Sequence, residues 1–477
     1  MAEFIVAIEL GSSKITGIAG RKNLDGTMTV LALVVEDASQ CIRKGVVNNI
    51  DKTAQSLTTI VGKLKKQLKH EIVHVYVGVG GQSIRSVKNV IVKNLPAETI
   101  ITSDMINELM DANRNMTYPE QEILDAAMQE YKVDKQLTLD PVGMKGCHIE
   151  GNFLNILGRK SFYDNLNNCF EKAGIAIAEM YLSPLALADS VLTEAEKRGG
   201  CALIDFGADT TTVAVYHKNV LRHLAVIPLG GNNITKDIAS LQMEEADAEK
   251  MKLKYASAFT DGSDVDIRIN YSIDSERSVE SLKFAEVVEA RVQEIVENAL
   301  HQIPSEYVSK LLGGLIITGG GANLKNIEQA FRSRTRIEKI RNAKFVIQTV
   351  TSTNSEINAK DGTMNTLLGL MAKGDINCAG NEVVLSPNLF DENSPTPSNP
   401  STLHQNTRKS NEIEPGVVQT AAEKEVERRR REEERKREDE ETGQLQHEEA
   451  EKRKNSFWGK LSRKIKDFSG SMLEPED

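Results

Sequence analysis

Short apolar runs alternate with amphipathic helical patterns from the start of the chain to about residue 390. Helical periodicity is clearest in Thr53–Lys69 and Val279–Ile303, where apolar residues recur three or four positions apart. The strand-like runs between such patterns are Phe4–Ile8, His74–Val79, Ala202–Phe206, Thr212–Tyr216 and Leu315–Thr318. Strands that alternate with helices predict an α/β architecture with buried sheets.

The composition changes near Pro387. Asp391–Gly416 is rich in Ser, Thr, Asn and Pro, which predicts a disordered linker. Ala421–Lys454 is almost wholly charged, and pairs such as Glu425 and Arg429 lie four residues apart. This pattern fits a solvated single helix and a disordered polyampholyte equally well.

The last segment, Asn455–Asp477, becomes apolar again. On a helical wheel, one sector of about 100° holds every large apolar side chain of Phe457–Phe468, namely Phe457, Trp458, Leu461, Ile465 and Phe468. The basic side chains Lys460, Arg463 and Lys464 lie outside that sector. Such a helix is typical of an anionic membrane surface. A helix docked on the folded body is the alternative, but the long polar linker favours the membrane.

Charge and cysteine content narrow the function classes. The 477 residues carry a formal net charge of −10, which argues against nucleic acid as a partner. The five cysteines show neither metal-ligand nor CxxC spacing, as expected for reduced thiols in a cytosolic protein. No stretch approaches the roughly 18 apolar residues that a membrane-spanning helix needs, so membrane contact is expected to be peripheral.

Two segments nearly 200 residues apart share one design. FIVAIELGSSKITGIAG (Phe4–Gly20) and CALIDFGADTTTVAVYH (Cys201–His217) each contain a strand, an acidic residue, a glycine two positions later, a hydroxyl-rich turn and a second strand. Such hairpin tips can bind phosphate through backbone N–H groups and hydroxyls. The predicted phosphate-binding residues are Gly11, Ser12, Ser13, Lys14, Gly207, Ala208, Thr210 and Thr211. Glu9 and Asp205 are placed to hold a hydrated Mg²⁺ through water.

A third segment, Gly313–Asn323, is a buried strand that leads into three consecutive glycines. Bare backbone at such a turn lets a flat group approach closely. Following two phosphate hairpins, it predicts an adenosine-binding loop formed by Gly319, Gly320, Gly321 and Asn323. Two related hairpins in one chain predict a cleft that grips a nucleotide from both sides.

Two other motifs have simpler interpretations. HEIVH (His70–His74) formally matches a zinc-protease motif, but it straddles the end of a helical pattern and the start of a strand. We interpret it as a helix-to-strand junction. VGVGG (Val77–Gly81) is interpreted as a strand end that leads into an inserted subdomain.

The three-part arrangement resembles the actin/Hsp70/sugar-kinase superfamily, and within it the FtsA family of bacterial cell-division proteins. The similarity covers roughly residues 4–385 and is carried by Val75–Ser86, Ser183–Leu192, Ile227–Ala239, Ala248–Tyr255 and Glu286–Glu297. It implies that Glu249 and Lys252 contact the sugar or base. The chain departs from the family pattern at Glu9, where Asp is usual, and at Asp209, where Gly is usual. Asp209 is expected to bring negative charge near the phosphate site.

The resemblance also implies an actin-like, two-lobed fold with an inserted subdomain. The expected ranges are 1–83, 159–195 and 363–388 for subdomain 1A, 84–158 for the inserted 1C, 196–239 and 304–362 for 2A, and 240–303 for 2B. Residues 389–454 would be the linker, and 455–477 the membrane-targeting helix.

The implied function is that of an ATP- and Mg²⁺-binding adaptor, at most a slow ATPase. It would self-associate into filaments and tether FtsZ to the cytoplasmic face of the inner membrane at the division site, together with downstream division proteins. A sugar or acetate kinase of the same superfamily is the alternative. It would need a catalytic aspartate in a substrate pocket, and it would have no use for a membrane-binding tail.

Overall fold

The computed structural model describes residues 3–260, 269–274 and 277–382. The predicted linker, charged segment and terminal amphipathic helix, residues 389–477, therefore lie outside the described residues. Within the described ranges, no helix is both long enough and apolar enough to cross a membrane.

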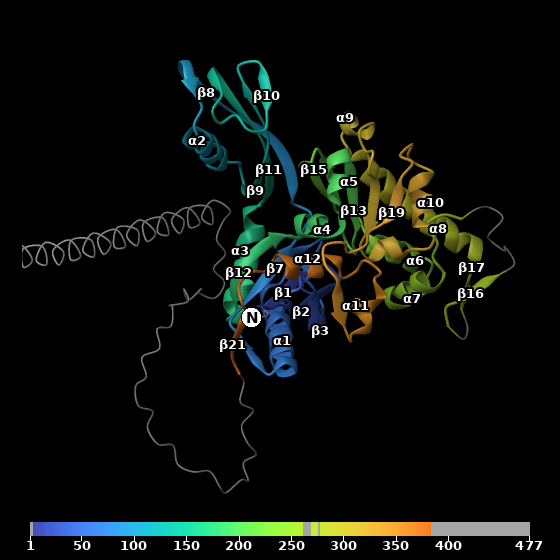
Figure 1. The fold of residues 1–477 in the computed structure, drawn as a ribbon. Helices are drawn as coiled ribbons and strands as arrows, with labels where there is room; N and C mark the ends of the chain where they lie inside the picture. Colours follow the sequence, from blue (N-terminus) through green and yellow to red (C-terminus); the bar gives the residue numbers. More distant parts are fainter. Residues whose placement is uncertain (1–2, 261–268, 275–276, 383–477) are drawn as a thin grey trace, which may run out of the picture. The chain divides into compact units, whose positions relative to one another are not determined.

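The fold has two halves. The half that contains the N-terminus, called the N-terminal half below, also includes later segments of the chain. It is built on a six-stranded sheet in the order β12-β7-β1-β2-β3-β20 (Figure 1). Its centre is the antiparallel pair β1 and β2, flanked by the parallel neighbour β7. The bounds are β1 Glu3–Leu10, β2 Lys14–Lys22, β3 Met28–Asp37, β7 His74–Val79, β12 Ala176–Leu182 and β20 Val350–Ser352.

Helices α1 (Ile50–Leu68) and α12 (Asn365–Lys373) pack on opposite faces of this sheet. A Cβ atom on Gly17 would meet Ile60 of α1, whereas one on Gly20 would meet Met371 of α12. Residues three apart on a strand point to opposite faces, so each glycine admits one helix. Asn49 caps α1 by accepting a hydrogen bond from the Lys52 backbone N–H.

A second, nine-stranded sheet has the order β10-β9-β11-β8-β15-β14-β13-β18-β19. Alternate residues of β13 belong to two different hydrophobic cores: Leu203 packs in the core of the N-terminal half, and Ile204 packs beneath α6 and α8. Burial on both faces explains the unbroken apolar run of this strand. The bounds are β13 Cys201–Phe206, β14 Thr211–His217, β15 Val220–Ile227, β18 Gly314–Thr318, β19 Ile340–Asn342, α6 Gly231–Ala239, α7 Glu245–Tyr255 and α8 Ser281–His301.

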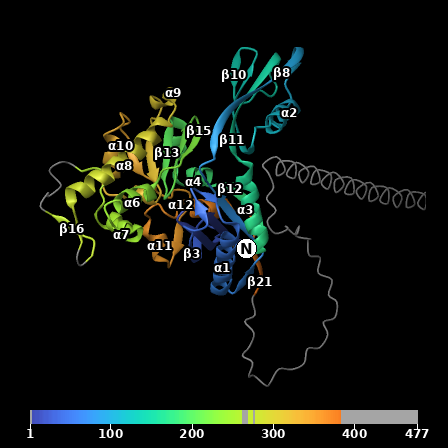
Figure 2. The ribbon, with the colours of Figure 1, turned by 180° about the vertical axis from the view of Figure 1, so that it is seen from behind.

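The remaining strands of this sheet form a separate layer. In the sequence, they lie between β7 and α3 (Lys160–Ala173). Helix α2 (Ser103–Arg114) packs against β8 and β11 in this layer, as both views show (Figures 1 and 2). A small core around Tyr131 and Phe153 holds these elements together. The layer continues the ladder of the second half at the pair Arg85 and Ala225, and hydrogen bonds such as that from the Leu224 N–H to Ser86 Oγ at 2.8 Å strengthen this junction. The bounds are β8 Arg85–Ile100, β9 Gln121–Val133, β10 Gln136–Thr138 and β11 Lys145–Arg159.

The structure confirms the strands and helices that the apolar pattern predicts. It also confirms both simpler interpretations. Helix α1 ends at Leu68, β6 spans His70–Ile72 and His74 begins β7, so HEIVH is a helix-to-strand junction. Val77–Val79 ends β7, and Gly80 and Gly81 begin the connection to β8. The cysteines in the described ranges are free thiols, and only Cys147 among them is exposed.

Candidate functional site

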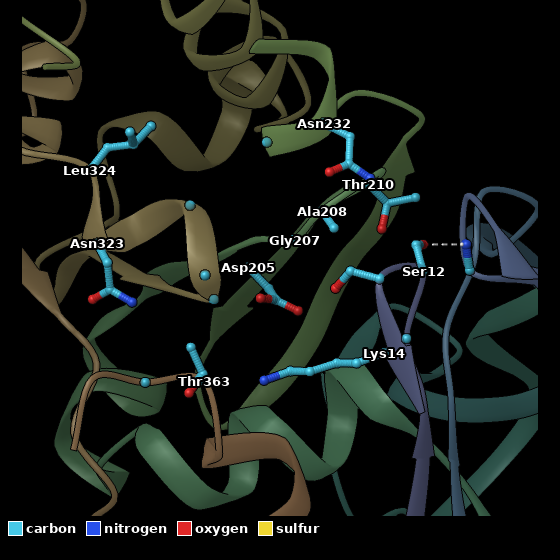
Figure 3. A pocket seen from close by; sticks show the side chains of 18 of the residues that line it. Ser12, Lys14, Asp205, Gly207, Ala208, Thr210, Asn232, Asn323, Leu324 and Thr363 are labelled. Carbon is cyan, nitrogen blue, oxygen red and sulfur yellow. Dashed lines mark hydrogen bonds between the residues drawn. The ribbon is translucent and has the colours of Figure 1, made fainter. Parts of the chain in front are cut away.

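A cavity of about 740 Å³ lies between the two halves, and residues from both predicted phosphate-binding hairpins and from the triple-glycine turn line it. This volume is within the range of about 300–1,000 Å³ that is typical of small-molecule sites. Figure 3 shows Ser12 and Lys14 on one side, Ala208 and Thr210 on another, and Asn323 with Leu324 opposite Ser12. The cavity thus brings together three segments that are far apart in the sequence.

The two hairpins are structural equivalents. The Gly11 N–H donates to the Lys14 carbonyl at 3.0 Å, and the Gly207 N–H donates to the Thr210 carbonyl at 2.9 Å. A Cβ atom on either glycine would lie within 3 Å of the same carbonyl that its N–H contacts. Both turns therefore need glycine at this position in order to close.

The three glycines after β18 differ in what constrains them. Gly319 has a φ of 88°, and a Cβ atom there would lie 2.4 Å from Asp205 Oδ1. A Cβ atom on Gly321 would lie 2.5 Å from the Phe206 ring. Gly320 has no heavy atom within 4 Å of the Cβ position and lines the cavity. Its bare backbone is therefore not required by packing and leaves room for a ligand.

Two acidic side chains line the cavity where the hairpins meet. Burial raises the pKa of Glu9 to about 7, and the nearby charge of Asp205 acts in the same direction, while Lys14 and Thr366 oppose it. Burial also raises the pKa of Asp205 to about 6. Lys14 extends into the space between Asp205 and Thr363 (Figure 3). Paired carboxylates that are costly to ionise fit a site completed by a cation.

The predicted sugar-binding residues both line the cavity but are engaged differently. The Lys252 ammonium donates to the Gly231 carbonyl at 3.1 Å and to Thr235 Oγ1 at 2.8 Å, and it pairs with Glu249 Oε2 at 2.7 Å. These contacts account for all three ammonium donors. Lys252 therefore ties α6 to α7 and orients Glu249, whose side chain is 40% exposed.

Two residues in the turn of the second hairpin, Thr211 and Asp209, do not line the cavity, although the sequence predicts that both lie at the phosphate site. Thr211 is fully buried, is not among the lining residues, and donates to the Leu229 carbonyl at 2.9 Å. Its hydroxyl supports the turn and does not face the cavity. Asp209 also lies outside the lining, because its carboxylate accepts hydrogen bonds from the Lys44 N–H and from Asn232. Its negative charge is therefore directed into these two contacts.

The sequence did not single out several other lining residues. Tyr255 and Tyr271 stack with ring centroids 4.2 Å apart and form an aromatic wall. Gly45 contributes from a turn that precedes α1, and Thr363 and Thr366 from the start of α12. They come from the end of α7, from β16 (Asn270–Ser272), and from α12 and the turns before α1 and α12, and only the fold brings them to the cavity. The run DGTMNT, which begins at Asp361, is the sequence feature that could have pointed to Thr363 and Thr366 as lining residues.

Comparison with known proteins agrees with this architecture. The profile described as "Cell division protein FtsA" matches residues 202–359, and that described as "SHS2 domain inserted in FTSA" matches residues 81–157. The second match overlaps the predicted insertion, 84–158. The solved PilM–PilN type IV pilus biogenesis complex aligns over 77% of this chain and 97% of that one, with a TM-score of 0.53 and 14% identity, which supports the actin-like fold alone.

Two curated relatives are similar over most of their length. The cell division protein FtsA of Porphyromonas gingivalis is 32% identical over 339 residues, 70% of this chain and 71% of the relative. That of Neisseria meningitidis is 33% identical over 331 residues, 68% of this chain and 80% of the relative. The chain is therefore a member of the FtsA family of cell division proteins, with an actin-like α/β fold.

Proposed function

We propose that this protein binds ATP with Mg²⁺ in the cavity and acts as a membrane adaptor in cell division. The observation that carries the nucleotide assignment is the cavity itself, where two equivalent glycine hairpins meet opposite the unobstructed backbone of Gly320. Backbone N–H groups and hydroxyls at the hairpin tips bind the phosphates. Glu9 and Asp205 hold Mg²⁺ through water, and Asn323 and Glu249 contact the adenosine.

The adaptor role follows from family membership together with the amphipathic pattern of residues 455–477. Filaments of this protein attach to the cytoplasmic face of the inner membrane and hold FtsZ there. The kinase alternative receives no support from the family assignment.

Sedimentation with vesicles tests the adaptor role. The full chain, ATP and Mg²⁺ are mixed with FtsZ and vesicles that contain phosphatidylglycerol. FtsZ is expected in the vesicle pellet only when the full chain is present. A version that ends at Asp391 should leave FtsZ in the supernatant and still bind it in solution. If vesicles carry the full chain to the pellet without FtsZ, the tethering proposal is wrong.

The affinity for Mg²⁺–ATP should rise with pH. Because Mg²⁺ binding favours ionised carboxylates, a proton must leave Glu9 at pH values below its pKa of about 7. Between pH 6 and pH 8 this linkage increases the association constant by about tenfold, and Asp205 adds a further factor of about two. Calorimetry across this range measures the change.

Glu9→Gln is the matched control, because it removes the titration and preserves the side-chain shape. Its affinity should be lower at pH 8 and should vary much less between pH 6 and pH 8. An equally steep pH dependence in Glu9→Gln would mean that another group, such as the nucleotide itself, releases the proton.

A further inference from the structure

One hydrogen bond joins the two halves of the protein beside the cavity and outside its lining. The backbone N–H of Lys44 lies in the turn between β4 (Ile42–Arg43) and β5 (Val46–Val47), and it donates to Asp209 Oδ2 at 3.0 Å. The other carboxylate oxygen accepts from the Asn232 side chain at 2.7 Å. Asp209 sits at the tip of the second hairpin, so this contact joins the turn of one half to the phosphate hairpin of the other.

The turn that carries Lys44 is fixed to the N-terminal half. The Gln82 N–H donates to the Lys44 carbonyl at 3.0 Å, and the Gly45 N–H donates to Ser12 Oγ at 2.8 Å, the dashed line in Figure 3. A Cβ atom on Gly45 would lie 2.7 Å from the Gly80 carbonyl oxygen, so the turn packs tightly on its own half. It therefore cannot follow Asp209 if the halves separate.

Asp209 is equally fixed to the second half. Asn232, which holds its Oδ1 atom, lies in the first turn of α6, and the Asn232 N–H donates to the Ala208 carbonyl at 2.7 Å. The Gly231 N–H similarly contacts the Gly207 carbonyl at 3.0 Å. These hydrogen bonds fix the Asp209 carboxylate relative to the second half. Separation of the halves must break the Lys44 contact.

We propose that Asp209 is a clasp that holds the nucleotide cleft closed both without and with nucleotide. Hydrogen bonds to an ionised carboxylate are about twice as strong as those between neutral groups. A residue without an acceptor, such as the neighbouring Ala208, could not make this contact. The clasp slows both entry and release of nucleotide, because each requires the cleft to open. This kinetic effect rests on the proposed nucleotide site, whereas the contact between the two halves does not.

Opening can be measured without any nucleotide. Spin labels are attached to the two new cysteines of the full chain that carries Ser39→Cys, Lys250→Cys and Cys147→Ser. Ser39 and Lys250 are exposed and lie in different halves, and Cys147→Ser removes the exposed thiol. The parent should give one narrow distance distribution. Asp209→Ala should give a broader distribution that extends to longer distances, and Asp209→Asn, with one acceptor oxygen, should fall between them. Asp164→Asn, at an exposed site, is the charge-matched control.

Stopped-flow kinetics with a fluorescent ATP analogue supply the second readout. In Asp209→Ala the association and dissociation rates should both rise by about tenfold, with little change in affinity. Loss of a mere ligand contact would instead raise only the dissociation rate. Identical distance distributions in the parent and Asp209→Ala would overturn the clasp. Failure of the parent to bind any nucleotide would contradict the proposed function, while the distance measurement would still decide the clasp.

Discussion

Gly320→Val should abolish nucleotide binding while the protein remains folded. The new side chain meets no heavy atom within 4 Å at its Cβ position and therefore projects into the cavity, where the adenosine is proposed to lie. Gly320 also does not have a positive φ, so valine fits the backbone. Calorimetry should show a loss of affinity for Mg²⁺–ATP of at least about a hundredfold, which corresponds to about 2.7 kcal/mol.

Two further glycine substitutions separate binding from folding. Gly62→Val makes the same change in α1, where the Cβ position also has open space, and should preserve affinity. Gly321→Ala brings a methyl group to 2.5 Å from the Phe206 ring and should lower the melting temperature of the empty protein. If Gly320→Val binds ATP as well as the parent, the triple-glycine turn is not the adenosine site.

The sequence predicts those parts of the fold in which a local pattern reflects a local constraint. The run around Leu203 and Ile204 predicts a buried strand because both faces of β13 are covered by core. The glycines of the two hairpins are equally readable, because Gly11 and Gly207 each close a turn against a backbone carbonyl. In each hairpin, the glycine and the carbonyl that it contacts lie three positions apart, and in β13 the uninterrupted apolar run itself reflects burial on both faces.

The contacts that the sequence could not predict join distant segments. Asp209 stands where the family usually has Gly, and this departure suggests a negative charge at the predicted phosphate site. In the structure, its carboxylate instead contacts the backbone of Lys44, 165 positions away in the sequence. Lys252 is similar: its residue type suits a ligand contact, but its donors are used by Gly231, Thr235 and Glu249. A backbone N–H leaves no signature in the sequence, so such partners become visible only in the folded chain.

Deletion of Asn455–Asp477, or Trp458→Glu, should abolish pelleting with anionic vesicles and preserve nucleotide binding. Near an anionic surface, each basic side chain of this segment contributes roughly 1 kcal/mol. The five apolar side chains add several more kcal/mol, at about 25 cal/mol per Å² buried. Ordering a helix costs about 1–2 kcal/mol per residue in backbone entropy. The entropy cost offsets much of the binding free energy, so a single tail binds weakly. Trp458→Glu removes one of the five apolar contacts and is therefore enough to abolish binding.

Gly459→Glu is the matched control for Trp458→Glu. It introduces the same charge, but on the polar side of the helical wheel, and should weaken pelleting only in part. In the parent, fluorescence of Trp458, the single tryptophan of the chain, should shift to shorter wavelength when vesicles are added. Firm attachment then depends on many tails acting together, since a filament raises the effective concentration of each tail at the membrane. Full pelleting of the deletion variant, or an unshifted tryptophan spectrum at saturating vesicle, would show that this segment is not the membrane anchor.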